Sequence, residues 1–373
     1  MIVLYILLAI IILLLMVVIH EFGHYIAGKL IKFKINEFSV GFGPKIVSKK
    51  KKNGEVFSLR LIPLGGYCAF EGESETSEDT TMRDPIFVDE SVENKNDAAK
   101  DASVRSFNDE KPWKRIIVLL AGGVFNLISA VIFSFLFIAI VGYATPKVAE
   151  RYVNPDTGTV YCEALSDGDE IIAVNGKKID LYHSFNEYTS QLKEGDSVVV
   201  TVVRDGKKHN IDLKFQKIQA EMDGKKEEYT GFGFKSENKY NRNLGQAFIQ
   251  CVPFTAKLSW SILGSFFQLI TGKLSIRAIS GPIGTVSAMA EVAQMDWRNV
   301  FLLLPLIASN LGLFNLLPIP ALDGSKVIFT TIEWIRKKPI NRKVEGYIHT
   351  VGIILLLAFV VIVDVINLIL RFV

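Results

Sequence analysis

Five consecutive residues, His20-Glu21-Phe22-Gly23-His24, have the types and the spacing of a metal site. Positions four apart share one face of a helix, so His20 and His24 can hold one Zn²⁺ together. Glu21 lies beside them and is placed to act as the general base on an attacking water, as in the HExxH arrangement. Alternatively, the two histidines are ordinary helix-end residues at a water interface, but such an end does not require this order of residues. The pattern therefore predicts a hydrolytic zinc site.

A second polar group lies far along the chain, inside an apolar stretch at residues 310–324. Pro318 and Pro320 are too close together for a regular helix to continue. Unwound backbone at membrane depth is tolerated only where it is buried or lines a wet cavity, which Asn310, Asn315 and Asp323 would enter. Two histidines leave zinc short of a third protein ligand, and Asp323 can supply it. Without the HExxH motif, an ordinary Asp-Gly turn would be the preferred interpretation of Asp323.

The elements that must position these residues are membrane helices. The chain has 373 residues, of which 49% are hydrophobic, and its mean hydropathy is +0.29. Four apolar segments, at roughly 2–30, 116–143, 301–322 and 351–370, are long enough to cross a bilayer of about 30 Å. The first is too long for a signal-peptide core and lacks a small-residue cleavage site, so we expect it to remain.

Lysine and arginine residues in the short flanks predict the orientation of these segments. They place both ends of the loop between the first and second segments, and the loop between the third and fourth, in the cytoplasm. Both termini and residues 146–298 then lie outside. The HExxH motif comes roughly 27–33 Å along the first helix, at the cytoplasmic rim, and the inward-running third segment brings Asp323 to the same depth.

The segment between the first two spans predicts a β-hairpin and an acidic insert. Residues 35–48 and 55–63 are expected to be strands joined by the lysine run 49–52, with a turn at 63–67. Gly41 and Gly43 would bend the first strand or admit another backbone. The hairpin edge could pair with an extended peptide. Residues 71–110 are rich in acidic side chains and are expected to form a flexible insert.

The outer region predicts a mixed β domain with one helix. Residues 167–176 favour a turn, a strand and an Asn-Gly turn, residues 184–192 a helix, and residues 197–204 and 209–215 a hairpin around Asp205-Gly206. Residues 245–270 repeat apolar residues at helical spacing. They predict a helix on the outer surface, which we prefer to an additional membrane segment.

Two more polar residues lie in the apolar segments. Asn126 is expected to hydrogen-bond between packed helices, with catalysis as the less favoured alternative. Asp364 is expected to form a local interfacial pair with Asn367 and Arg371. The three cysteines have no CxxC spacing, so neither a disulfide framework nor a cysteine zinc site is indicated, and a net charge of +3 gives no reason to expect a nucleic-acid partner.

Together these motifs resemble the site-2 protease family of intramembrane zinc metalloproteases, and most closely its RseP-like (RasP-like) branch. Residues 20–24 match the first family motif, and residues 315–324 (NLLPIPALDG) match its N-x-x-P…L-D-G motif. Residues 63–67, 107–115 and 280–284 are further matches. Residues 167–176 (DGDEIIAVNG) resemble part of an extracytoplasmic PDZ domain.

The resemblance implies His20, His24 and Asp323 as Zn²⁺ ligands and Glu21 as the base. It implies that substrate is positioned by Asn310, Asn315, Pro318 and a membrane-associated β-hairpin containing Gly41 and Gly43. The chain departs from the family pattern at Gly123, where proline is usual, and at Ser325, where a second glycine often follows.

The expected fold is a polytopic α-helical membrane protein with four transmembrane helices, a membrane-associated β-hairpin and an extracytoplasmic PDZ domain (α+β). The four transmembrane helices are expected at 1–30, 113–145, 299–323 and 350–373. Between them lie the β-hairpin (31–70), the acidic insert (71–112), the PDZ domain (146–217), the extracytoplasmic region with an amphipathic helix (218–298) and a cytoplasmic loop (324–349). The expected function is cleavage of single-span membrane proteins, such as anti-sigma factors or remnant signal peptides, within the cell membrane. The alternatives are a non-catalytic PDZ scaffold and a zinc or proton transporter, and the latter commonly shows an internal repeat that this chain lacks.

Overall fold

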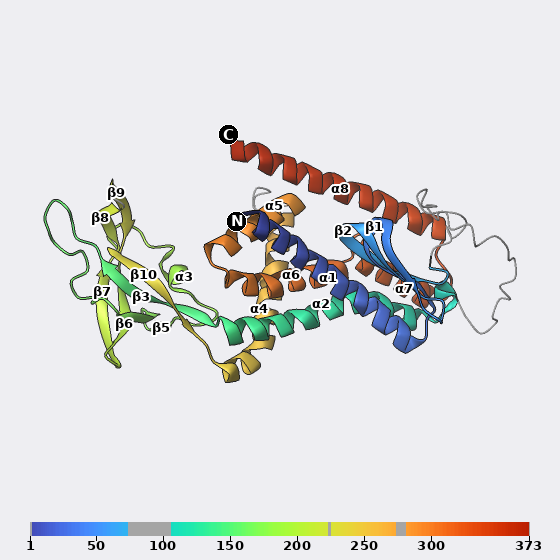
Figure 1. The fold of residues 1–373 in the computed structure, drawn as a ribbon, viewed down its shortest axis with the longest axis horizontal. Helices are drawn as coiled ribbons and strands as arrows, with labels where there is room; N and C mark the ends of the chain where they lie inside the picture. The colour runs from blue at the N-terminus through green and yellow to red at the C-terminus, as the bar shows by residue number, and fades with distance from the viewer. Residues whose placement is uncertain (1, 74–105, 223–224, 274–280, 373) are drawn as a thin grey trace. The chain divides into compact units, whose positions relative to one another are not determined.

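The structure is a computed structural model that describes residues 2–73, 106–222, 225–273 and 281–372 (Figure 1). It divides into two compact units, one formed by Met1–Ser134 and Thr255–Val373 and the other by Phe135–Phe254. The first unit contains both halves of the predicted metal site. The second unit contains most of the predicted outer β domain.

Four described helices are long and apolar enough to cross a membrane, in agreement with the four apolar segments expected from the sequence. They are α1 (Ile2–Ile31), α2 (Pro112–Ile140), α6 (Asn299–Leu316) and α8 (Arg342–Phe372). The side of the membrane that each helix end faces stays a prediction, based on the lysine and arginine residues that flank the helices. The helix expected to reach residue 323 ends at Leu316, because Pro318 and Pro320 cannot donate the backbone bonds that would extend it. A separate helix, α7 (Asp323–Arg336), then begins at the predicted third ligand.

A buried apolar core joins α1 to its neighbours. Helix α5 (Pro282–Met295), which the sequence did not predict, packs against α1 together with α2 and α6. The opposite side of α1 exposes large apolar residues, as expected for a surface in lipid. The fully buried members of this core are Ala9, Ile12, Met16, Ala130, Met289 and Ala308.

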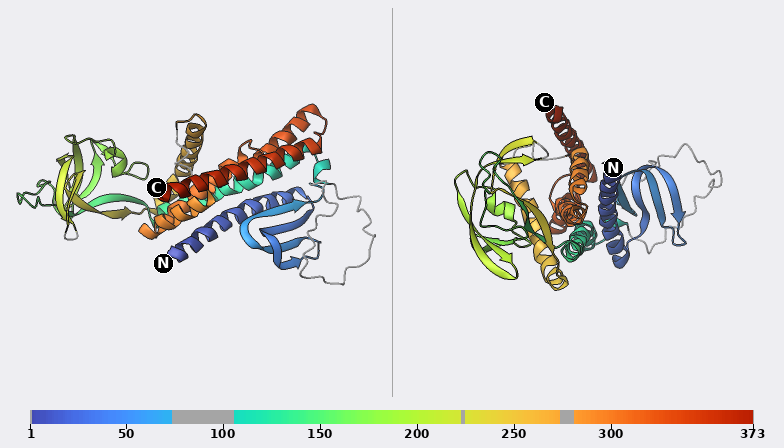
Figure 2. Two further views of the ribbon diagram at one scale, coloured as in Figure 1. Left: turned by 90° about the horizontal axis from the view of Figure 1, so that it is seen from above. Right: turned by 60° about the vertical axis from the view of Figure 1, so that its left-hand side comes forward.

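The predicted hairpin is formed by β1 (Ile35–Lys50) and β2 (Val56–Phe70), which lie beside α1 (Figure 2). Its register is more elaborate than two strands and a turn. Phe38 pairs with both Phe57 and Cys68, so the first half of β1 lies between two halves of β2. The expected turn at 63–67 is therefore a bend inside β2, where Gly65 has φ +116° and Gly66 pairs with Val40.

One part of this sheet packs against α1, and another part forms an exposed apolar tip. Phe38 and Phe57 pack against Tyr25 of α1, each with ring centroids 5.6 Å apart. At the bend of β1, Gly41 and Gly43 adopt φ values of +87° and +83°, which favour glycine. The surrounding tip exposes the apolar residues Phe42, Ile46, Val47, Leu59, Leu61 and Ile62. An exposed apolar tip agrees with a membrane-associated hairpin, whose depth in the bilayer stays a prediction.

The ends of the acidic insert meet at the base of this sheet. Phe107, in the short helix η1 (Phe107–Asp109), stacks against Phe70 with ring centroids 5.3 Å apart and donates its backbone N–H to Glu71 O over 2.7 Å. Ser106 Oγ donates to Gly72 O over 3.1 Å. The predicted flexible insert itself lies largely outside the described residues, at 74–105.

The second unit is an antiparallel sheet with strand order β10-β3-β4-β6-β7. The predicted hairpin around Asp205-Gly206 is confirmed, with φ values of +51° and +76°, and so is the predicted strand followed by the Asn175-Gly176 turn. The predicted helix is confirmed as a shorter α3. The sheet extends beyond residue 217, because β10 pairs with β3. Strands β8 and β9 form a separate two-stranded sheet. The elements of the unit are β3 (Tyr143–Arg151), β4 (Glu170–Val174), β5 (Lys177–Lys178), α3 (Phe185–Thr189), β6 (Ser197–Arg204), β7 (Lys207–Lys214), β8 (Gln216–Met222), β9 (Lys225–Gly231) and β10 (Phe234–Asn241).

The helix predicted at 245–270 is confirmed as α4 (Leu244–Ile270), which falls outside the four candidate spans. It is amphipathic: Ala247, Cys251 and Phe254 are buried, whereas Phe248 and Trp260 are exposed. An amphipathic helix of this kind suits a membrane surface. Its location on the outer surface stays a prediction.

Candidate metal centre

Helix α1 supplies two of the predicted ligands. His20 and His24 are one turn apart and buried, and their Nε2 atoms lie 3.3 Å from one another. The regular helix is sufficient to bring the two rings to the same face. Glu21 follows His20 directly in the same turn.

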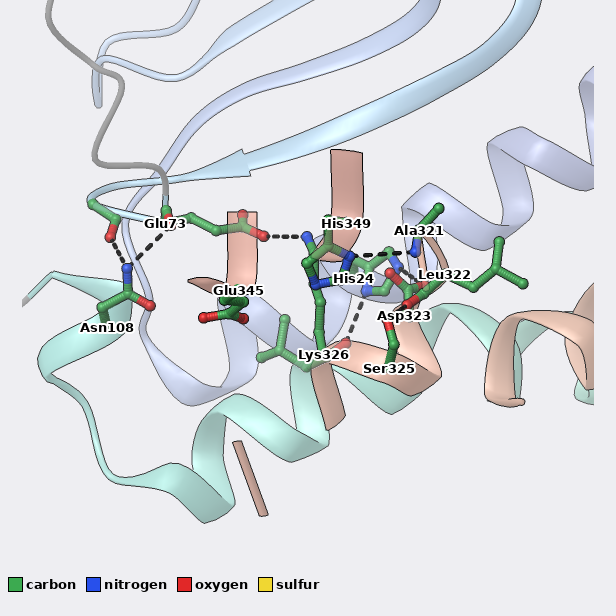
Figure 3. Close-up of polar contacts among 12 residues, drawn as sticks. His24, Glu73, Asn108, Ala321, Leu322, Asp323, Ser325, Lys326, Glu345 and His349 are labelled. Atoms are coloured by element: carbon green, nitrogen blue, oxygen red, sulfur yellow. Dashed lines mark hydrogen bonds and ion pairs between the residues drawn. The ribbon is translucent and has the colours of Figure 1, made fainter. Parts of the chain in front are cut away.

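Asp323 completes the cluster from the opposite end of the chain. Its Oδ2 atom lies 2.9 Å from His20 Nε2 and 3.1 Å from His24 Nε2. Figure 3 shows His24 and Asp323 meeting where the loop before α7 reaches α1. Among the described residues this is the group of histidine, cysteine and acidic side chains that could hold a metal ion. The structure thus brings together the three ligands expected from the sequence.

The arrangement fits a tetrahedral zinc ion. Ligand atoms bound about 2.0–2.1 Å from Zn²⁺ lie about 3.3 Å from one another, which is close to the three separations seen here. Helix α2 leaves room for the ion at Gly122, since a β-carbon there would lie 2.4 Å from His24 Nε2 and 2.8 Å from His20 Nε2. Two imidazoles and one carboxylate are also the donor set of catalytic zinc sites that keep one position open.

A backbone contact orients His24. Its Nδ1 atom donates to Val118 O of α2 over 2.8 Å, which places the proton on Nδ1 and leaves Nε2 as the metal-binding nitrogen. Gly23 permits this close approach of α1 and α2, because a β-carbon there would lie 2.6 Å from Ala121 O.

Asn126 plays the corresponding role for His20. This fully buried amide places Nδ2 3.2 Å from His20 Nδ1, while its Oδ1 atom is buried and has no hydrogen-bond partner in the described part of the chain. Exchanging the amide oxygen and nitrogen, which look alike in most structures, lets Oδ1 accept from His20 Nδ1–H. His20 then also presents Nε2 to the metal. The expected hydrogen bond between helices is thus confirmed for Asn126, and its partner is a metal ligand; the position four residues after Gly122 already places both residues on one face of α2.

Glu21 lies between the ligands and the sheet. A β-carbon at Gly66 of β2 would lie 3.2 Å from Glu21 Cγ, so the backbone of β2 passes directly over the predicted base. The side chain is only half-buried. This position suits a base that must reach both a water and a bound peptide.

The loop that carries Asp323 is closed by local bonds. Ser325 Oγ donates to Leu322 O over 2.7 Å, and a β-carbon at Gly324 would lie 2.2 Å from Leu317 O. Ser325, one of the two departures from the family pattern, therefore helps to close the turn. One turn later, Lys326 Nζ lies 2.9 Å from Glu73 Oε1, and the charge of Glu73 raises the pKa of the lysine ammonium.

The predicted substrate-positioning residues lie outside this cluster. Asn310 is exposed on α6, Asn315 is half-buried near its end, and Pro318 is exposed in the following loop. Within the described residues, neither asparagine hydrogen-bonds to a ligand. Gly41 and Gly43 lie at the bend of β1, opposite Ile62. Their roles toward substrate stay predictions.

Asp364 has a contact that the sequence did not indicate. Its Oδ1 atom accepts a bond from the backbone N–H of Gly284, 3.3 Å away, in the first turn of α5. A β-carbon at Gly281 would lie 2.4 Å from the same oxygen. A carboxylate at a helix N-terminus is favourable, so Asp364 ties α8 to α5.

Comparison with known proteins agrees with this geometry. The model of peptidase family M50 matches residues 8–359. A protein of Fusobacterium nucleatum is 31% identical over 366 residues, covering 96% of this chain and 97% of the relative. A protein of Agrobacterium fabrum is 26% identical, covering 96% of this chain and 93% of the relative. A protein of Staphylococcus aureus is 26% identical, covering 95% of each.

Each of these three relatives is named as a putative zinc metalloprotease. The match spans α1, which carries His20 and His24, and the loop that carries Asp323. The donor set and the family therefore agree on zinc as the cofactor. The chain belongs to peptidase family M50, the site-2 protease family of membrane-embedded zinc metalloproteases.

Proposed function

We propose that this protein is an intramembrane endopeptidase that cleaves the transmembrane segment of single-span membrane proteins. The observation that carries the proposal is the convergence of His20 and His24, within the apolar helix α1, with Asp323 at the start of α7, and with Glu21 beside them. By the predicted orientation, this site lies near the cytoplasmic face and the second unit lies outside the cell.

The residues divide the chemistry between them. His20, His24 and Asp323 would hold a Zn²⁺ ion, which would supply a Lewis acid for activating a water and polarising the scissile carbonyl. Glu21 takes the proton of the attacking water and passes it to the leaving amine. Asn126 and Val118 O hold the two imidazoles in the orientation that this requires.

A strand edge beside Glu21 supports a peptide as the substrate. A transmembrane helix hides its backbone bonds, so it must unwind before a protease can reach it. Residues 66–70 of β2 pair with β1 on one side, and within the described part of the chain no strand pairs with their other side. An extended substrate added to this edge would pass over Glu21.

The second unit supports a filter for substrates, as a PDZ domain would provide. Strand β10 is an edge of its sheet, and Phe234 at its start lies 6.5 Å from Phe185 of α3, measured between ring centroids. An edge strand facing a helix is the place where PDZ domains add a peptide strand. On this proposal the unit admits substrates already shortened outside the membrane, such as anti-sigma factors or remnant signal peptides.

The test is cleavage of a tagged single-span substrate with a short outer tail, in membranes, by the wild type and by Glu21→Gln. We expect product from the wild type alone and full zinc content in both proteins, because Glu21 is the base and not a ligand. Cleavage by Glu21→Gln would overturn the assignment of the base. No product from either protein, with zinc present in both, would favour a non-catalytic scaffold.

A further inference from the structure

Helix α8 touches the loop that precedes Asp323 at two points. The backbone N–H of Ala321 donates to His349 Nδ1 over 3.3 Å, as the dashed line between them in Figure 3 shows. Three residues later on the same face, a β-carbon at Gly352 would lie 2.4 Å from Pro320 Cβ. The helix backbone therefore lies directly against the loop.

The loop needs such support at Ala321. This residue has φ +84°, in the left-handed region that residues other than glycine rarely adopt. It lies two residues before Asp323. A strained backbone persists only where surrounding contacts hold it, and the loop's own bonds hold Leu322 and Ser325 rather than Ala321. Among the hydrogen bonds of the described residues, the one to His349 reaches the strained residue.

The contacts of His349 determine its role as an acceptor. Because Nδ1 accepts from Ala321, the ring carries its proton on Nε2 when neutral, and Nε2 is buried with no hydrogen-bond partner among the described residues. The ring also meets Phe329 of α7, with centroids 5.6 Å apart. His349 thus touches the loop through one hydrogen bond and the following helix through its ring.

We propose that His349 and Gly352 are positioning residues for the zinc site. They hold the loop between α6 and α7 in the conformation that brings Asp323 Oδ2 to His20 and His24, although neither residue contacts a ligand. The inference rests on the zinc site and not on the identity of the substrate. Zinc affinity therefore tests it independently of peptide cleavage.

Two substitutions separate the hydrogen bond from the ring contact. His349→Asn keeps an acceptor at the δ position and loses the ring, whereas His349→Phe keeps a ring and loses the acceptor. Zinc affinity of the full chain in detergent is measured by competition with a chelating dye. We expect about tenfold weaker binding for His349→Phe, as for the loss of other outer contacts of a metal site, and near wild-type binding for His349→Asn.

A matched glycine pair on α8 tests the second contact. Gly352→Ala should weaken zinc binding, because its β-carbon displaces the loop at Pro320. Gly346→Ala, six residues earlier with no atom within 4 Å of its β-carbon, should leave binding unchanged. Thermal unfolding of each variant shows whether it is folded. Wild-type affinity in folded His349→Phe, or equal losses in the Phe and Asn variants, would overturn the proposal.

Discussion

The two sides of the metal centre are built in different ways. On α1, five consecutive residues of a regular helix supply two ligands and the base. On the other side, Asp323 follows a broken helix, two prolines and a residue with φ +84°. The first side follows from helix geometry alone. The second also depends on contacts with distant elements, such as the bond from Ala321 N–H to His349 of α8.

The ligands on α1 also depend on the neighbouring helix α2, which sets the orientation of the two imidazole rings and not their position along the helix. Val118 O and Asn126 of α2 set which nitrogen of each imidazole faces the metal. A histidine can bind zinc through either nitrogen, and the partner of the other nitrogen decides between them. The comparison between the two sides can be sharpened by four substitutions, taken from the largest expected effect to the smallest.

Removing a helix ligand should have the largest effect. We expect His24→Ala to weaken zinc binding by far more than the roughly 100-fold that the loss of an outer-shell partner costs. Cleavage should be lost as well. Metal analysis of the purified protein measures the effect, with Glu21→Gln as the control that retains zinc. Normal zinc content in His24→Ala would mean that the metal is held elsewhere.

Filling the space that α2 leaves for the metal should have the next largest effect. In Gly122→Ala, the β-carbon would lie 2.4 Å from His24 Nε2, and we expect zinc binding to weaken by about 100-fold. Alanine has a higher helix propensity than glycine, by about 1 kcal/mol, so the change in propensity should not destabilise the fold. Chelator competition and thermal unfolding measure the two effects. Gly264→Ala, with no atom within 4 Å of its β-carbon, is the control.

Loss of the amide beside His20 should have a smaller effect. Asn126→Leu removes the acceptor for Nδ1–H, and we expect about 10- to 100-fold weaker zinc binding. Asn126→Asp retains an oxygen acceptor and should remain within a few-fold of the wild type. If the leucine variant bound zinc normally while folded, Asn126 would have only a packing role between the helices.

The ion pair one turn beyond Asp323 should matter least. The side chains of Lys326 and Glu73 are 39% and 24% exposed, and exposed pairs contribute about 0.2–1 kcal/mol. We expect Lys326→Met to change zinc affinity by no more than a few-fold. A loss as large as that of Asn126→Leu would show that the loop is held by this charge pair and not by its backbone contacts. Raised salt should then weaken zinc binding in the wild type too.

Much of this architecture could be predicted because its signals are local. A run of apolar residues as long as the bilayer predicts a spanning helix, and all four such runs lie in described helices long and apolar enough to span. Pro318 and Pro320 end a helix wherever they stand, so the break before Asp323 was also predictable. The spacing of His20 and His24 acts in the same way, through the helical repeat.

The elements that escaped prediction depend on pairing between distant residues. In the hairpin, Phe38 of β1 pairs with Phe57 on one side and with Cys68 on the other. The sequence pattern of one strand does not show which strands pair with it. Strand β10 joins the sheet of the second unit through β3, more than eighty residues earlier in the chain. Helix α5 has no strong apolar periodicity to mark the face it packs against α1.

The sequence by itself determined which residues could bind zinc, which segments could span a membrane and where the helix before Asp323 must end. Each of these depends on residue type and on contacts within a few positions along the chain. Only the tertiary structure decided that Asn126 faces His20, that β2 passes over Glu21 and that α8 supports Ala321. These contacts join residues about 30 to more than 100 positions apart, and they exist only once the helices and the sheet have packed.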